Sequence, residues 1–246
     1  MITAVKYHVR RIVALLILFL LVRAGFKALL HDEPSDPPAA EQETSVSAEP
    51  RRQAAASIPQ GRPVEMVVPV LGLRAGFEQA DCRVVDGKID PKSMDKACAL
   101  TGESYPYELP GTDAGDIVVV AGHTGAGVDA VFNKLYDGKA ERHTVAKGDT
   151  LFLRTETSGD DWLKYTATDL HDPDKGALAG NAEIWGTGPM PGRLLTISCI
   201  QPANLLADSV RNAVVGWQLA GTTTDDEVET AFEPRQSRFL RLFCGV

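Results

Sequence analysis

The chain has 246 residues, of which 44% are hydrophobic and 24% are charged, and its formal net charge is −8. This is enough for one globular domain with attached segments, but not for two ordinary domains once the N-terminal region is set aside. The negative charge and the lack of a Lys and Arg cluster in the folded part argue against a nucleic-acid partner, because phosphate binding needs a basic surface. We therefore expect a peptide or small-molecule partner.

The N-terminal segment has the pattern of an export signal. Lys6 and Arg10 precede an unbroken apolar run at residues 12–22, which is the order of charged and apolar residues in exported chains. The run reaches the length of a bilayer crossing, about 20 residues, when it continues to Leu30. We predict that residues 1–30 form a cytoplasmic N-terminus and a single membrane helix, with the rest of the chain outside the cell. Cleavage of this segment is the alternative.

The next segment, residues 31–63, is rich in Pro, Ala, Ser and Glu and has almost no aromatic residues. Such a composition cannot bury enough apolar surface to offset the entropy lost on folding. We predict a disordered linker that separates the membrane helix from a domain at residues 64–246.

From Val64 onward the sequence consists of short apolar or alternating runs bounded by Gly, Pro and Asp, which is the pattern of β-strands. The predicted strands lie at residues 64–73, 116–122, 150–155, 162–170, 193–200 and 212–219. The best helical candidates are residues 129–137 and 202–210. These elements predict a mainly β fold, a barrel or a sandwich, with one or two short helices.

Four cysteines allow two disulfide bonds with three possible pairings in an exported domain. Cys82 and Cys98 flank a polar loop with Asp-Gly and Asp-Pro turn signals, and we predict that they pair. A bridge of that span contributes about 3 kcal/mol in the loop-entropy model. Cys199 and Cys244 then remain, and a bridge between them is the purely structural alternative for Cys199.

Two further residues have positions that suit a catalytic site. His123 follows the predicted strand at residues 116–122 and opens a glycine-rich loop, where the backbone can bend around a ligand. Arg211 stands at the start of the predicted strand at residues 212–219. Each residue on its own is most simply an ordinary loop histidine or surface arginine.

These residues occur together in an order that resembles the sortases, which are cysteine transpeptidases of Gram-positive cell surfaces. The shared features are a strand ending in Gly-His, a Phe-x-x-Leu segment, a strand ending in a hydroxyl residue and Cys, and an Arg on the next strand. In this chain they are Gly122 and His123, Phe132 and Leu135, Ser198 and Cys199, and Arg211. The resemblance extends from about residue 64 to residue 220, and it is greatest to the class E and class F sortases of high-GC bacteria.

Two differences from the family concern the peptide groove. Ser198 stands where sortases usually have Thr, and residues 200–209 differ from the glycine-rich segment common in class F. The insert that carries Cys82 and Cys98 also differs from the simplest family members.

The resemblance implies a sortase-like closed β-barrel of about eight strands and a reaction that needs no metal or organic cofactor. The Cys199 thiolate would attack the Thr carbonyl of an LPxTG-like sorting motif and form a thioacyl enzyme. His123 would act as general acid and base, since imidazole exchanges protons near neutral pH. Arg211 would donate hydrogen bonds to a substrate carbonyl.

The resemblance also implies the partners and the groove. The donor would be the sorting-signal peptide of a secreted surface protein, and the acceptor would be an amine of a peptidoglycan precursor or a pilin lysine. The loop at residues 171–191 would line the groove, with Ile184 and Trp185 taking apolar side chains and Ser198 beside them. The alternative for the two loop residues is that they pack the loop onto the barrel.

Two other classes of protein remain possible. Another exported cysteine enzyme, an L,D-transpeptidase or a papain-like peptidase, is the first, although the sequence before Cys199 lacks the His and Gly of the former. In papain-like enzymes the Cys precedes the His, whereas here His123 comes first. The second is a β-rich surface-binding module whose cysteines are all paired.

Overall fold

The structure is a computed structural model, and it describes residues 57–102, 105–204 and 206–233. None of the described helices combines the length and the hydropathy that a bilayer crossing requires. The predicted membrane helix at residues 1–30 lies outside the described residues. The folded part begins before Val64, because Ile58 is buried and its N–H donates to Thr112 Oγ1 at 3.0 Å.

The main element is an eight-stranded sheet with the order β2-β1-β9-β10-β12-β11-β6-β5. Its strands are β1 (Pro63–Val68), β2 (Leu73–Gly76), β5 (Cys98–Ala99), β6 (Val118–Ala121), β9 (Thr150–Thr155), β10 (Asp161–His171), β11 (Arg193–Cys199) and β12 (Asn212–Thr224). Neighbouring strands are antiparallel except for the β6–β11 pair, which is parallel. The prediction of a mainly β fold with about eight strands is confirmed.

The sheet curls without closing into a complete barrel. Within the described residues, its two edges meet through an isolated bridge between Phe77 and Ala97, just beyond β2 and β5. In this bridge the Ala97 N–H donates to Gly76 O and Ala97 O accepts from the Glu78 N–H. The expected closed barrel is therefore corrected to a curled sheet whose edge strands meet at one place, because β5 has only two residues and cannot form a ladder with β2.

Two hydrophobic clusters lie on opposite faces of the strands that carry the candidate site. The larger fills the concave side and includes Leu194, Val120 and Val215. The second lies on the other face of β5, β6, β11 and β12 and includes Leu195 and Ile197. Residues alternate between these clusters along each strand, as the two-residue period of a strand requires.

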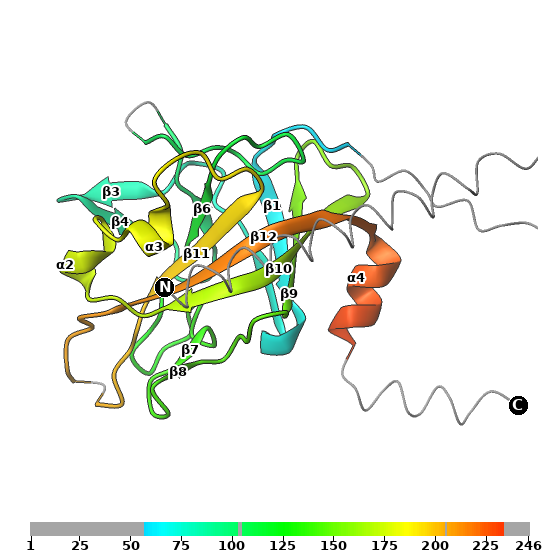
Figure 1. The fold of residues 1–246 in the computed structure, drawn as a ribbon. Helices are drawn as coiled ribbons and strands as arrows, with labels where there is room; N and C mark the ends of the chain where they lie inside the picture. The colour runs from blue at the N-terminus through cyan, green and yellow to red at the C-terminus, as the bar shows by residue number, and fades with distance from the viewer. Residues whose placement is uncertain (1–56, 103–104, 205, 234–246) are drawn as a thin grey trace, which may run out of the picture. The chain divides into compact units, whose positions relative to one another are not determined.

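Shorter elements cover the second cluster. They are the hairpin of β3 (Arg83–Val85) and β4 (Lys88–Asp90), and the helices α2 (Lys175–Leu178) and α3 (Ala182–Trp185). Figure 1 shows them gathered beside β6 and β11. A further helix, α4 (Asp225–Phe232), packs its Val228 against Val67, Phe152 and Trp162 at the other end of the sheet.

The predictions of helices at residues 129–137 and 202–210 are both wrong. Residues 131–135 form turns and lead into β7 (Tyr136–Asp137), which pairs with β8 (Arg142–His143). The Val131 and Phe132 N–H groups donate to Met94 O and His123 O instead of to helical carbonyls.

The second predicted helix, residues 202–210, is irregular in its described part. There the Asn204 side chain accepts from the Leu206 N–H at 3.1 Å. Such local side-chain bonds compete with helix formation. Instead, the described helices lie in the segment between β10 and β11 and after β12, apart from one 3-10 turn, η1 (Pro69–Leu71).

Candidate active site

Strand order brings the backbones of the three candidate residues to one end of the sheet. The parallel strands β6 and β11 end together, with Ala121 opposite Ile197 and the Gly122 N–H donating to Ile197 O at 3.2 Å. The antiparallel strand β12 begins at this end, with Asn212 opposite Cys199. His123, Cys199 and Arg211 therefore stand at the ends of three adjacent strands.

Cys199 differs from the other two cysteines that the structure describes. It is a free, partly exposed thiol, whereas Cys82 and Cys98 form the disulfide bond that the sequence predicted. Cys244 lies outside the described residues. Strand alternation puts Cys199 on the same face as Leu195 and Ile197, which belong to the second hydrophobic cluster. The thiol therefore faces the side covered by α2, α3 and the β3–β4 hairpin.

Hydrogen bonds tie the end of β11 to the loop that carries His123. Thr124 Oγ1 donates to Cys199 O at 3.0 Å, and Gln201 Nε2 donates to Thr124 Oγ1 at 3.3 Å. On the other side, Asn212 Nδ2 donates to Ser198 O at 3.1 Å. The backbone on both sides of the thiol is thus fixed by side chains from β12 and from the histidine loop.

His123 is half-buried and has a defined partner. Its Nε2 lies 2.7 Å from Pro91 O, in the loop closed by the Cys82–Cys98 bond. Gly122 permits a close approach beneath it, because a Cβ at this position would lie 2.7 Å from the ring of Phe132. The predicted Phe-x-x-Leu residues, Phe132 and Leu135, are both buried core residues that support the loop.

The side chain of Arg211 does not share the face of the thiol. Its Nη1 lies 2.9 Å from Asp172 Oδ2, its Nη2 lies 3.9 Å from Glu141 Oε1, and its guanidinium lies 6.0 Å from the Tyr136 ring. The reason is the register of the strands, since Asn212 faces Cys199 and Arg211 is its neighbour. Burial and the carboxylate of Asp172 raise the pKa of the Tyr136 phenol.

The three residues predicted to bind substrate occupy different environments. Ile184 is fully buried in the second cluster. Ser198 is buried and its Oγ has no partner within the described part of the chain. Trp185 is half-buried, stacks on Tyr107 with 5.2 Å between ring centroids, and donates from Nε1 to Leu178 O at 2.7 Å. Among these three, Trp185 has surface that a peptide can contact.

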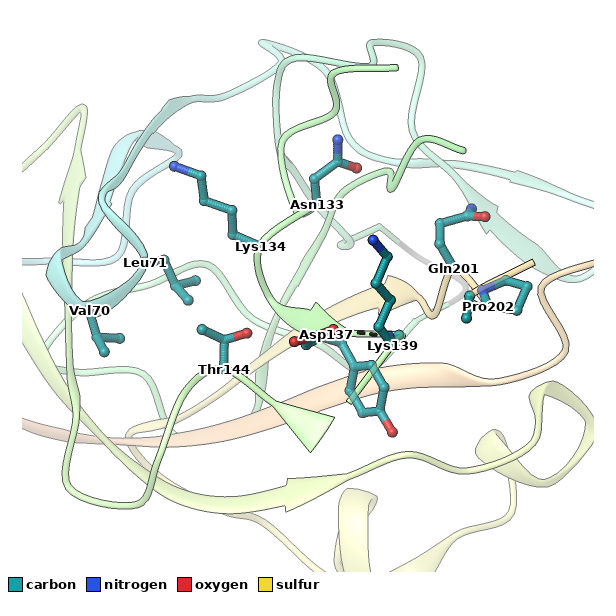
Figure 2. Close-up of a pocket in the computed structure, with 12 residues that line it drawn as sticks. Val70, Leu71, Asn133, Lys134, Asp137, Lys139, Thr144, Gln201 and Pro202 are labelled. Atoms are coloured by element: carbon teal, nitrogen blue, oxygen red, sulfur yellow. Dashed lines mark hydrogen bonds between the residues drawn. The ribbon is translucent and has the colours of Figure 1, made fainter. Parts of the chain in front are cut away.

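A pocket of about 430 Å³ adjoins the segment that follows Cys199 (Figure 2). Gln201 and Pro202 form one side of it, and Lys134 and Lys139 stand at its rim. Its walls include Val70 and Leu71 from η1. None of the three candidate catalytic residues lines this pocket, so it is a neighbouring surface of the site rather than its centre.

Several residues that contact the candidates were not predicted from the sequence. Thr124 and Asn212 are sequence neighbours of His123 and Arg211, and that adjacency was the signal available. Pro91 and Asp172 come from distant segments. The Asp-Pro step at Pro91 predicted only a turn, and no sequence pattern singled out Asp172. Within the described residues, no group of three or more His, Cys, Asp or Glu side chains could hold a metal ion.

No protein-family model and no curated protein matches the chain. Solved structures with similar folds are sortases. Sortase C-1 from Actinomyces oris has 17% identity and a TM-score of 0.43, and the match covers 63% of this chain and 72% of that one. Sortase C-3 from Streptococcus pneumoniae has 15% identity and a TM-score of 0.47 over 83% and 77% of the two chains. Listeria monocytogenes sortase A has 14% identity and a TM-score of 0.46 over 72% and 100%.

Proposed function

We propose that this chain is a sortase-type cysteine transpeptidase, in which Cys199 is the nucleophile and His123 the general acid and base. One observation carries the proposal. Cys199 is a free, partly exposed thiol at the end of β11, and His123 follows the parallel neighbour β6 at the same end of the sheet. The motif order noted in the sequence supports the same reaction.

The first half-reaction forms a thioester. The thiolate sulfur of Cys199 attacks the carbonyl carbon of the scissile Thr, and the bond from that carbon to the Gly nitrogen breaks. His123 gives a proton to the departing Gly amine. The hydrogen bonds from Thr124 and Asn212 hold the backbone of β11 while the sulfur changes partners.

The second half-reaction transfers the acyl group to an amine. The acceptor nitrogen attacks the thioester carbon, His123 takes the excess proton, and the thiolate leaves. Arg211 would donate to a substrate carbonyl in both steps, for which its guanidinium has to exchange Asp172 for the peptide. Arg211 directly precedes β12 and its side chain is partly exposed, so the guanidinium is free to leave Asp172 and to reach a peptide bound at this end of the strand.

The finer parts of the proposal come from the sequence resemblance. The donor is an LPxTG-like sorting peptide cut after Thr, and the acceptor is an amine of a peptidoglycan precursor or a pilin lysine. The enzyme is of the class E or class F type and acts outside the cell, attached to the membrane by residues 1–30. Trp185 and the loop at residues 171–191 contact the peptide, with Ile184 and Ser198 packed behind it.

The proposal is tested by incubating the purified protein with a panel of sorting peptides and an amine and by detecting the joined product by mass spectrometry. A second measurement traps the acyl enzyme, whose mass increases by the acyl part of the peptide. We expect product from the wild type and neither product nor adduct from Cys199→Ala. Absence of both from the wild type with every peptide contradicts the proposal.

The surface-binding module is distinguished by its thiols. In that alternative Cys199 is paired, and the oxidised protein has no reactive thiol. Alkylation of the folded protein followed by peptide mapping is expected to label Cys199 and to leave Cys82 and Cys98 unlabelled. An unlabelled Cys199 favours the binding module.

A further inference from the structure

The insert closed by the Cys82–Cys98 bond lies against the histidine loop. Cys98 stands in β5 and pairs with Ala121 of β6, two residues before His123. In the middle of the insert, Pro91 is buried and its carbonyl oxygen lies 2.7 Å from Nε2 of His123. A segment without an assigned role thus contacts the proposed acid and base directly.

The chemistry of this contact determines which ring nitrogen carries hydrogen. A carbonyl oxygen can only accept a hydrogen bond, so Nε2 of His123 has to be the donor. The neutral ring then has its lone pair on Nδ1, and Nδ1 is the atom that can take and release a proton. An acceptor that holds one ring nitrogen also fixes the orientation of the ring, as the carboxylate of a Ser-His-Asp triad does.

The Pro91 carbonyl is held in place from both sides. On the N-terminal side, Val84 and Ile89 of the β3–β4 hairpin pack against the second hydrophobic cluster, and Arg83 pairs with Asp90 at 2.6 Å. The hairpin turn has positive φ at Asp86 and Gly87, which suits a tight two-residue turn.

On the C-terminal side of Pro91, the Ser93 N–H donates to Glu78 Oε1 at 2.6 Å. Met94 O accepts from the Val131 N–H at 2.8 Å. Val131 lies in the segment that also bonds to His123, because the Phe132 N–H donates to His123 O at 3.0 Å. The insert and the histidine loop are therefore joined at the ring and at the backbone.

We propose that the disulfide-closed insert, residues 83–97, positions His123 through the Pro91 carbonyl and thereby makes turnover depend on the Cys82–Cys98 bond. This inference rests on the proposed function, since it assigns a positioning group to the proposed acid and base. The bond fixes both ends of the insert, and the carbonyl holds the ring with Nδ1 free for proton transfer. An oxidising environment is then a requirement for full activity as well as for stability.

The test compares the wild type with the double variant Cys82→Ser, Cys98→Ser. We expect the double variant to lower kcat by about 10- to 100-fold, the effect of a displaced catalytic group. The second readout is the tautomer of His123 in long-range proton–nitrogen NMR spectra. We expect the hydrogen on Nε2 in the wild type and a mixture of both tautomers in the double variant.

Glu78→Ala gives a milder version of the same change, because it removes the acceptor for Ser93 and leaves the disulfide intact. It is expected to lower kcat less than the double variant and to shift the tautomer in the same direction. Lys88→Ala, at the exposed tip of the hairpin, is the matched control and should match the wild type in both readouts. If the double variant does not fold, the turnover and the His123 tautomer of Glu78→Ala test the inference.

A folded variant of either kind with wild-type turnover and an unchanged His123 tautomer overturns the inference. The ring spectrum does not depend on any substrate. A wild type without transpeptidase activity therefore contradicts the proposed function, while the spectra still test whether the insert orients His123.

Discussion

The two faces of the β11–β12 pair differ at the candidate site. One face carries the thiol of Cys199 (the thiol side), and the other carries the guanidinium of Arg211 (the guanidinium side), although Arg211 is only one residue from the partner of Cys199. On the thiol side, Cys199 is free and its backbone is held by neutral hydrogen bonds from Thr124 and Asn212. On the guanidinium side, Arg211 is held by an ion pair to Asp172 at 2.9 Å, over the ring of Tyr136. The thiol of Cys199 is therefore available for reaction, whereas the guanidinium of Arg211 is already paired with a carboxylate.

This difference shows that sequence order and strand adjacency do not by themselves bring side chains together. Cys199 and Asn212 are opposite one another, so Arg211 belongs to the other face of the strand. The Arg211–Asp172 pair is partly exposed, with 32% and 47% of the two side chains accessible. Exposed pairs of this kind contribute at most about 1 kcal/mol, so a peptide carbonyl can compete for the guanidinium.

The largest expected effects come from removing the functional group on each side. Cys199→Ala is expected to lower turnover by at least about 1000-fold, because no thioester can form. Arg211→Ala is expected to lower kcat by about 100- to 1000-fold, as loss of an oxyanion donor does. Steady-state transpeptidation with sorting peptides measures both. Undiminished turnover in either variant, with an unchanged circular dichroism spectrum, removes that residue from the mechanism.

A smaller loss is expected from the backbone support of the thiol. Thr124→Val keeps the shape of the side chain but removes the hydroxyl that donates to Cys199 O. We expect kcat to fall about tenfold, since a small displacement of the nucleophile is sufficient for such a loss. Thr124→Ser retains the hydroxyl and should restore most of the activity. Equal rates in the Val and Ser variants contradict a positioning role.

A gain of activity is expected from the guanidinium side. Asp172→Asn weakens the competitor for Arg211, and kcat/KM should rise by about two- to fivefold, which corresponds to an exposed ion pair of up to about 1 kcal/mol. The control is Glu141→Gln, because this carboxylate is 3.9 Å from the guanidinium and its side chain is 75% exposed. A decrease in Asp172→Asn shows instead that the ion pair orients Arg211 for its task.

The smallest expected effect is the pH dependence of the free energy of unfolding that His143 causes on the guanidinium side. Burial lowers the pKa of His143, whose ring lies edge-on to Tyr136, below its ordinary value of 6.5. The unfolded chain then binds a proton more readily than the folded chain, so the contribution of His143 to stability is lost as pH falls below about 6.5.

The measurement is urea unfolding of the wild type and of His143→Gln between pH 8 and pH 5. We expect the stability advantage of the wild type over the variant to shrink as pH falls through this range. The other ionisable groups near this ring, His171 and Asp172, are present in both proteins, so the comparison isolates the change at residue 143. A difference that stays constant with pH contradicts the effect.

Sequence patterns predicted much of the fold and part of the site. Four of the six predicted strands, at residues 116–122, 150–155, 162–170 and 193–200, lie in the sheet within two residues of their predicted bounds, because short apolar runs between turn residues leave few alternatives. The strand predicted at residues 212–219 continues to Thr224, and the one predicted at residues 64–73 is divided into β1, η1 and β2. The Cys82–Cys98 bond was predicted from the turns between the two cysteines. Two helices, at residues 129–137 and 202–210, were not found, because hydrogen bonds from distant or local groups replace helical bonds there.

The sequence by itself determined the order of strands along the chain and the residue types at their ends, because both depend on local patterns of two to ten residues. It therefore indicated His123 and Cys199 as a pair at strand ends. Only the tertiary structure decided which face each side chain occupies and which distant groups touch it. The contact of Pro91 with His123 and the pairing of Asp172 with Arg211 join segments separated by 32 and 39 positions. Such contacts follow from sheet register and loop packing, which local patterns do not specify.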